Sequence, residues 1–237
     1  MKLYKLTDQD GRTQGPTQWG YGVKHSIEDG KRSTALCSHG VLHAYKNINL
    51  ALLLNPNHAD IGNPLIWEAD GEIVAEDWGK CGCWTLTTVE RIDYPGWYVT
   101  HRHDVQVMFA ILCAESVISY FDKYNPTDDR PRKAIEAARE YWKTKTAYAA
   151  ARAADAADAA RAAADAAADA AADAAAYAAR AAADAAYAAA YAAAYAAAYA
   201  AAYAAYAARA AASAAAYEKL DFCNLADMAV KESDAMT

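Results

Sequence analysis

The sequence predicts an α+β protein, in which a small mixed α/β N-terminal domain (residues 1–100) precedes an all-α, alanine-rich helical domain (residues 101–237). Two observations carry this prediction. All 11 glycines lie within the first 100 residues, where short apolar segments alternate with turn-forming dipeptides. From residue 147 to residue 217 the chain is almost entirely alanine, interrupted by larger side chains at a helical interval.

Several segments of the N-terminal domain have the alternating, β-branched and aromatic composition of strands. Asp70-Gly71 separates two of them and predicts a two-residue hairpin turn, because this dipeptide accepts positive φ angles. Residues 47–54 predict a short helix that ends before Pro56. The predicted strands are residues 2–6, 41–45, 65–69, 73–76 and 83–92.

Two amphipathic helices are expected between the Tyr94-Pro95-Gly96 break and the alanine tract. In residues 105–120, apolar side chains recur in steps of four and three, as on the buried face of a helix. Residues 132–143 form the second helix, with Thr127, Asp128 or Asp129 as its N-cap and Pro131 near its first turn.

The alanine tract carries twenty larger residues from Tyr148 to Tyr217, three or four positions apart, which is the period of an α-helix. A single helix over residues 147–217 would be about 105 Å long at 1.5 Å per residue. Neither glycine nor proline follows Pro131, which favours such a rod, whereas ordinary helix lengths favour shorter helices folded back on one another. We predict the bundle, closed by a further helix in the tail, residues 218–237.

Composition restricts the classes of partner. The formal charge of −7 and pI near 5.3 argue against nucleic acid, whose phosphates need clustered Lys and Arg. We expect no membrane-spanning segment, because no strongly apolar run reaches about 18–20 residues, and the first residues lack a secretion signal. The five cysteines are expected to be free thiols in a cytoplasmic protein.

The segment from Asp104 onward resembles a known family. It contains "DDRPRKAIEAAR", from Asp128 to Arg139, followed by alanine repeats with Tyr, Arg or Asp at every third or fourth place. Residues 104–217 are thereby similar to the alanine-rich immunity proteins of bacterial polymorphic toxin systems. This resemblance implies a non-enzymatic interaction protein that binds a toxin or host defence protein and occludes it.

A second resemblance covers part of the N-terminal domain. "LCSHGVLHAYKNINLALLL" (residues 36–54) and "PLIWEADGEIVAEDWGKCGCWTLTTVERI" (residues 64–92) are similar to a domain of unknown function that is frequent in phage genomes. The pairing of the two resemblances implies a phage or prophage protein, so that an anti-defence inhibitor is the expected variant of the immunity-like function.

Tyrosines dominate the second half of the alanine tract and are the predicted partner-binding residues. Tyrosine offers a large, rigid, amphipathic contact surface, which makes it frequent at protein interfaces. The other interpretation is a solvated Asp/Arg face with tyrosine rings packed between helices. The candidate residues are Tyr177, Tyr187, Tyr191, Tyr195, Tyr199, Tyr203 and Tyr206.

Other functions remain as alternatives. A self-associating structural protein, such as a virion-associated one, could use the alanine faces for homo-oligomerisation. An enzyme in the N-terminal part, of an ADP-ribosyltransferase-like or another kind, could use His39, His43, His101 or His103 in acid–base chemistry. A metal site at Cys37-Ser38-His39 and Cys81-Gly82-Cys83 is disfavoured, since its spacing is shorter than that of common zinc sites. We therefore predict no catalytic residue, no metal and no cofactor.

Overall fold

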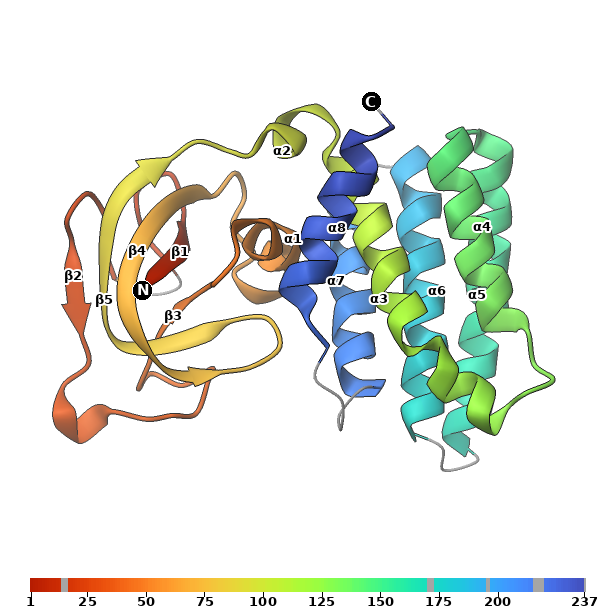
Figure 1. Cartoon of the computed structure of the whole chain (residues 1–237), viewed down its shortest axis with the longest axis horizontal. Coiled ribbons are helices and arrows are strands. Elements are labelled where there is room, and N and C mark those ends of the chain that lie inside the picture. Colours follow the sequence, from red (N-terminus) through yellow and green to blue (C-terminus); the bar gives the residue numbers. More distant parts are fainter. Residues whose placement is uncertain (14–16, 170–172, 195–196, 215–219, 237) are drawn as a thin grey trace. The chain divides into compact units, whose positions relative to one another are not determined.

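The computed structural model describes residues 1–13, 17–169, 173–194, 197–214 and 220–236. They divide into two compact units, which we call the sheet unit, Met1–Gly96, and the helical unit, Trp97–Thr237; both are drawn in Figure 1. The sheet unit contains strands β1 to β5 and helix α1, and α3 to α8 belong to the helical unit. The predicted α+β class is confirmed.

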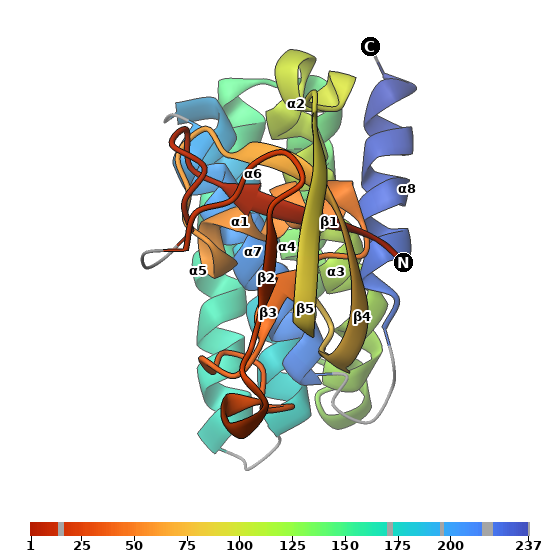
Figure 2. The ribbon, with the colours of Figure 1, turned by 90° about the vertical axis from the view of Figure 1, so that its left-hand side faces the viewer.

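The strands of the sheet unit form one antiparallel sheet with the order β1-β4-β5-β2, and β3 pairs with the beginning of β5. Tyr4 and Tyr45 exchange two backbone hydrogen bonds of 2.8 and 2.9 Å, which join the end of β3 to β1 and curl the sheet back on itself. Figure 2 shows the long strands β4 and β5 bending side by side. The bounds are β1 (Lys2–Thr7), β2 (Lys24–Ser26), β3 (Leu42–Ala44), β4 (Leu65–Glu76) and β5 (Cys81–Ile92), with a 3₁₀ turn at Asp29–Lys31.

One part of the core of the sheet unit is an apolar cluster to which several strands contribute. Two of its members are the fully buried Cys81 and Cys83, which pack as small apolar side chains. Beside it, the buried indole of Trp67 donates from Nε1 to Thr7 Oγ1 at 3.0 Å, so this polar group is satisfied in the interior. The cluster consists of Leu3, Trp19, Ala44, Ala69, Cys81, Cys83 and Leu86.

The predicted hairpin at Asp70-Gly71 is wrong, because β4 runs continuously through this dipeptide. Gly71 does not adopt a positive φ. A Cβ there would lie 2.9 Å from the carbonyl oxygen of Thr85, so glycine permits close approach of β5 at an irregularity in the pairing. The turn follows Glu76 instead, where the Asp77 carboxylate accepts hydrogen bonds from two backbone N–H groups at 2.8 Å.

Helix α1 (Ile48–His58) begins as expected, since Asn47 accepts a hydrogen bond from the Leu50 N–H at 2.9 Å. Its predicted end before Pro56 is wrong, because the helix continues to His58. Proline this close to the end removes one backbone hydrogen bond while only two helical residues follow it. The Asn55 side chain then fixes the last turn, with hydrogen bonds of 2.9 and 3.2 Å to the backbone of Ile61.

The helical unit is organised around α3 and α6. Helix α3 contacts α4, α6, α7 and α8, and α6 contacts α3, α4, α5 and α7. The long helices lie side by side in Figure 1. The bounds are α2 (Gly96–Thr100), α3 (Arg102–Tyr124), α4 (Arg130–Thr144), α5 (Ala147–Asp169), α6 (Asp173–Ala194), α7 (Ala197–Ala214) and α8 (Phe222–Asp234).

Helix α3 supplies the large core side chains, because residues 105–114 are all buried. By length and composition it could cross a membrane, contrary to the expectation that no apolar run is long enough. However, 72% of its most apolar stretch is buried inside the structure. A helix that is packed on several sides needs apolar residues around its circumference, and this packing accounts for the composition.

The alanine tract folds back into α5, α6 and α7, which confirms the predicted bundle and contradicts the single rod. The alanines of α6 are buried on several sides; Ala178, Ala182 and Ala185, for example, are 0% exposed. The separation of packed helices depends on the side chains at the contact. Methyl groups therefore allow α6 to lie close to its neighbours.

Ion pairs and caps fix the helices around α3. Helix α4 begins after Asp129 with a proline in its first turn, as expected. Arg139 of α4 binds the Glu115 carboxylate of α3 at 2.6 Å and lies 3.8 Å from Glu232 of α8. Helix α8 is the predicted closing helix of the tail, and its N-cap Asp221 accepts a hydrogen bond from a backbone N–H at 3.0 Å.

Candidate functional site

The predicted partner-binding tyrosines that the structure describes belong to two adjacent helices, α6 and α7. Tyr195 lies outside the described residues. The backbone of Tyr199 belongs to α7, but its side chain is also outside the described part. The candidate tyrosines whose side chains the structure describes are Tyr177, Tyr187 and Tyr191 of α6, and Tyr203 and Tyr206 of α7.

Four of these rings form what we call the tyrosine cluster: Tyr187, Tyr191, Tyr203 and Tyr206. The rings of Tyr191 and Tyr203 are stacked almost parallel, at 1° and 5.3 Å between centroids. Tyr187 approaches Tyr203 at 5.0 Å, and Tyr206 meets Tyr203 edge-on at 6.0 Å. Each such pair contributes about 0.5–1.5 kcal/mol beyond area burial. The cluster therefore packs α7 against α6. Packing of tyrosine rings between helices was the other interpretation of these residues, and the structure contains it.

A polar border from α5 adjoins the cluster. The Tyr187 hydroxyl donates a hydrogen bond to the Asp158 carboxylate, and Arg161 also hydrogen-bonds Tyr187. Nearby on α6, burial raises the pKa of Asp184 to about 7, although the positive charges of Arg180 and Arg161 act in the opposite direction. Close to neutral pH, a carboxyl beside the cluster thus changes its charge.

Tyr206 of the cluster and Tyr177, which precedes the cluster on α6, are both exposed. Tyr177 is 39% exposed and Tyr206 is 45% exposed. The guanidinium of Arg180 lies 6.0 Å from the centroid of the Tyr177 ring, within the range of a cation–π contact. Rings that are held by their neighbours lose little side-chain entropy on binding. That these tyrosines contact a partner stays a prediction.

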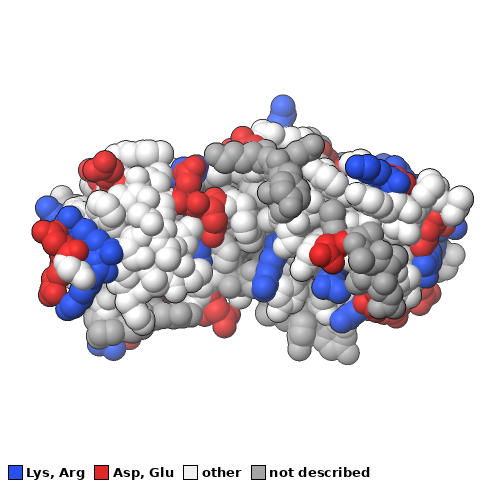
Figure 3. All heavy atoms as spheres, turned by 90° about the horizontal axis from the view of Figure 1, so that it is seen from below, with Lys and Arg blue, Asp and Glu red and all other residues white. Residues whose placement is uncertain are grey.

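Charges of both signs are interspersed on the surface. Figure 3 shows one face, on which basic and acidic side chains occur close together between larger uncharged areas. On α5, exposed carboxylates such as Asp155 and Asp165 alternate with the exposed Arg161. This mixture does not provide the clustered cations that bind nucleic acid.

The polar border was not among the sequence predictions. Asp184 shares the helical stripe of Arg180 and Tyr187, so its place beside the tyrosines follows from spacing alone. Asp158 and Arg161 are 29 and 26 positions before Tyr187. Their contact with it depends on how the alanine tract folds back, which the periodicity does not specify.

The histidines considered for catalysis are divided between the units. In the sheet unit, His39 is exposed, whereas His43 Nε2 accepts a hydrogen bond from the Cys37 N–H at 3.0 Å. In the helical unit, His101 lies 2.8 Å from the Asp234 carboxylate, and burial lowers the pKa of His103. His43 and His101 thus each have a polar partner that requires no catalytic role, and the enzyme alternative stays a hypothesis.

The cysteines considered for a metal site have separate surroundings. Cys81 donates to the carbonyl oxygen of Ala44 at 3.3 Å inside the core, whereas the exposed Cys37 accepts a hydrogen bond from the Lys80 ammonium at 2.8 Å. Among the residues that the structure describes, no group of three or more His, Cys, Asp or Glu side chains is placed to hold a metal ion.

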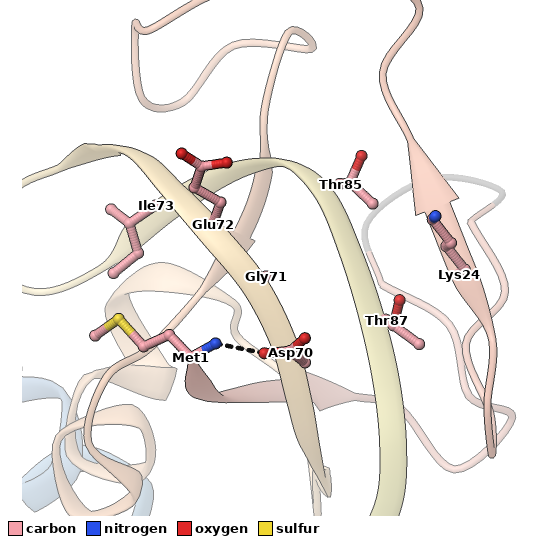
Figure 4. Close-up of a pocket in the computed structure, with 8 residues that line it drawn as sticks. All are labelled: Met1, Lys24, Asp70, Gly71, Glu72, Ile73, Thr85 and Thr87. Atoms are coloured by element: carbon pink, nitrogen blue, oxygen red, sulfur yellow. Dashed lines mark hydrogen bonds and ion pairs between the residues drawn. The ribbon is translucent and has the colours of Figure 1, made fainter.

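Described residues of the sheet unit line hollows on its surface, and two of them are large enough to consider. One, of about 600 Å³, is lined by β2, β4 and β5 around the ion pair between the Met1 amino group and Asp70, as Figure 4 shows. The other, of about 640 Å³, contains Lys5, Trp19, His43 and Lys80 in its lining. Pockets of a few hundred Å³ are large enough for small ligands.

Comparison with known proteins assigns the helical part of the chain. The family model described as Imm-5 like putative immunity protein matches residues 96–222, which is more than half of the 237 residues. The match includes the tyrosine cluster and its polar border. No curated protein and no solved structure matches the chain. The similarity of residues 36–54 and 64–92 to a phage-associated domain stays a prediction.

Proposed function

Because the chain belongs to the Imm-5 like immunity protein family, we propose that its helical unit binds a protein toxin through the tyrosine cluster and blocks the toxin by occlusion. The family implies an immunity-like role of binding a protein partner such as a toxin, which confirms the predicted resemblance. Occlusion, the contact surface and the toxin's identity belong to our proposal.

The observation that carries the proposal is the stacked arrangement of Tyr191 and Tyr203, with the open ring of Tyr206 at its edge. Tyrosine is enriched among the few interface residues that supply most of the binding energy. Two helices hold the cluster in place, so a partner would meet a surface that is already ordered. Preorganisation of this kind lowers the entropic cost of association.

The charge beside the cluster favours a basic partner surface. Asp155, Asp158 and Asp165 of α5 are exposed and outnumber the exposed Arg152 and Arg161 of the same helix, and the formal charge of the chain is −7. A net negative charge accelerates encounter with a cationic partner, and this effect weakens at high salt. We therefore propose a toxin with a lysine- or arginine-rich face, bound in the cytoplasm, where the free thiols of this chain stay reduced.

The test begins with capture of the partner by the tagged full chain, followed by measurement of the affinity with purified components. The double variant Tyr177→Ala/Tyr206→Ala should weaken binding at least tenfold, because truncation of a tyrosine that acts as an interface hot spot costs about 2 kcal/mol or more. Both side chains are exposed, so helicity measured by circular dichroism should not change.

Tyr148→Ala is the matched control. Tyr148 is 72% exposed at the beginning of α5, and its loss should leave the affinity unchanged. Equal affinity of the double variant and the wild type would contradict the cluster as the contact surface. Capture of a host defence protein in place of a toxin would favour the anti-defence alternative. Capture of nothing but a second copy of the chain would favour self-association.

A further inference from the structure

The cleft of about 640 Å³ in the sheet unit is chemically distinct from the proposed toxin-binding surface. Lys5 of β1 and Lys80 of the β4–β5 turn line it, and its described lining contains no Asp or Glu side chain. A hollow with two ammonium groups and no carboxylate is unexpected in a chain with a formal charge of −7.

Lys5 is the more unusual of the two cations, because its residue is only 8% exposed. Its Nζ donates to the carbonyl oxygen of His43 at 2.8 Å and lies 5.1 Å from the centroid of the Trp19 ring. Burial lowers its pKa to about 8. Buried charges are normally paired with an opposite charge, and an anion in the cleft would supply one.

Lys80 is held at the rim by the Cys37 sulfur, to which its Nζ donates at 2.8 Å. Cys37 has a positive φ of 63°, an uncommon conformation for a residue other than glycine. The His43 ring fixes this backbone by accepting the Cys37 N–H at 3.0 Å. Burial lowers the pKa of His43 to about 4, so this ring is neutral and adds no further charge.

The cleft also contains buried ring nitrogens without a partner among the described residues. The indole Nε1 of Trp19 is buried, in a residue that is 2% exposed, and makes no hydrogen bond. His58 Nδ1 is likewise buried without a hydrogen bond, and burial lowers the pKa of this ring to about 4, so only one of its two nitrogens carries a hydrogen. A buried N–H without an acceptor costs about 1–3 kcal/mol, so the Trp19 indole points to a ligand that offers acceptor atoms.

One wall of the cleft is aromatic. The rings of Tyr45 and His58, which both line the cleft, are stacked at 6.1 Å and 17°. Trp78, outside the lining, lies 5.5 Å from His58. Asp77, outside the lining, uses its carboxylate to accept the Gly79 and Lys80 N–H groups of the turn. A flat ring can stack on such a wall, while its charged substituent faces the lysines.

We propose that this cleft binds a small organic anion, in which a phosphate or carboxylate group is attached to a flat ring. Lys5 and Lys80 receive the anionic group, Trp19 Nε1 donates to it, and Tyr45 with His58 contacts the ring. This site goes beyond the proposed toxin binding, since the family match covers residues 96–222 and the cleft is built from the sheet unit.

The test is a titration of the full chain with phenyl phosphate and with benzoate, followed through the indole N–H signals in ¹H–¹⁵N spectra. The Trp19 signal, assigned by the Trp19→Phe variant, should shift saturably with at least one anion. The two probes distinguish a phosphate from a carboxylate ligand. Benzamide, which has the ring without the charge, and inorganic phosphate, which has the charge without the ring, should each bind more weakly.

Lys80→Met should weaken binding of the responding probe at least about tenfold, because hydrogen bonds to charged groups contribute strongly. Lys24→Met removes the same charge from exposed β2, outside the cleft, and should leave the affinity unchanged. Lys80 is at the rim, so unchanged dispersion of the other indole signals will confirm that the variant folds.

Three results would overturn the proposal. The first is no shift of the Trp19 signal at about 10 mM of either anion, where ligands of millimolar affinity are mostly bound. The second is binding of benzamide as tight as that of the anion to which the Trp19 signal responds. The third is an equal loss of affinity in Lys24→Met and Lys80→Met.

Discussion

Replacing Ala182 of α6 by leucine should destabilise the helical unit. Ala182 is 0% exposed, as are Ala178, Ala179, Ala185 and Ala186, which lie one turn away on the same helix. Helix α6 contacts α3, α4, α5 and α7. A larger side chain at this position must therefore push apart helices that meet through methyl groups.

The expected cost follows from the volume that the substitution adds. Leucine carries three more carbon atoms than alanine, and overpacking a well-packed core typically costs about 1–3 kcal/mol. The surrounding alanines have no χ angles through which they could move away, so the upper end, about 3 kcal/mol, applies. For a protein of this size, that corresponds to a loss of roughly 6–12 °C in the midpoint of thermal unfolding.

The assay is thermal unfolding followed by circular dichroism at a helical wavelength, with Ala162→Leu as the matched control. Ala162 is an exposed residue of α5, and alanine and leucine have similar helix propensities. The control should change the unfolding free energy by no more than about 0.5 kcal/mol. Equal midpoints for the two variants would refute the close packing of alanine faces around α6.

Two further predictions concern single positions. Because the pKa of Asp184 is raised to about 7 in the folded chain, the free energy of unfolding should fall by at most about 4 kcal/mol as pH rises from about 4 to about 7. In urea unfolding, Asp184→Asn should lack this decline. If the variant shows the same dependence of unfolding free energy on pH, other groups cause it. Gly71→Ala should cost about 1–3 kcal/mol, because its Cβ would meet the Thr85 carbonyl oxygen at 2.9 Å. Gly30→Ala is the control, because a Cβ at that position meets open space, and it should leave the free energy of unfolding in urea nearly unchanged. Equal losses of unfolding free energy in Gly71→Ala and Gly30→Ala would contradict a steric cause.

The local features of the fold could be predicted well because their causes lie within a few residues. The helical period of the alanine tract, the short helix that begins near Asn47 and the proline in the first turn of α4 all have causes that act over one or two turns. The two local errors share one cause. Asp70-Gly71 and Pro56 have the chemistry of chain breaks, yet pairing of β4 with β5 and the Asn55 anchor after α1 outweigh it.

The candidate sites were less accessible from the sequence. The sequence shows that the tyrosines recur at a helical interval. The stacking of Tyr191 on Tyr203, however, requires that α6 and α7 are antiparallel neighbours. In the cleft, Lys5 and Lys80 are 75 positions apart. No local pattern connects them, because the sheet brings β1 and the β4–β5 turn together only after all its strands have paired.

By itself, the sequence determined that this chain has a strand-rich beginning and a long alanine-rich helical part, and that the large side chains of that part share one stripe. Backbone propensity and side-chain spacing are properties of short segments, so they can be determined from the sequence without knowledge of the tertiary structure. The tertiary structure alone decided that the tract folds into three helices, that tyrosines stack across two of them and that buried lysine and indole groups face one cleft. These outcomes depend on contacts between residues far apart in the chain, whose energies no local segment contains.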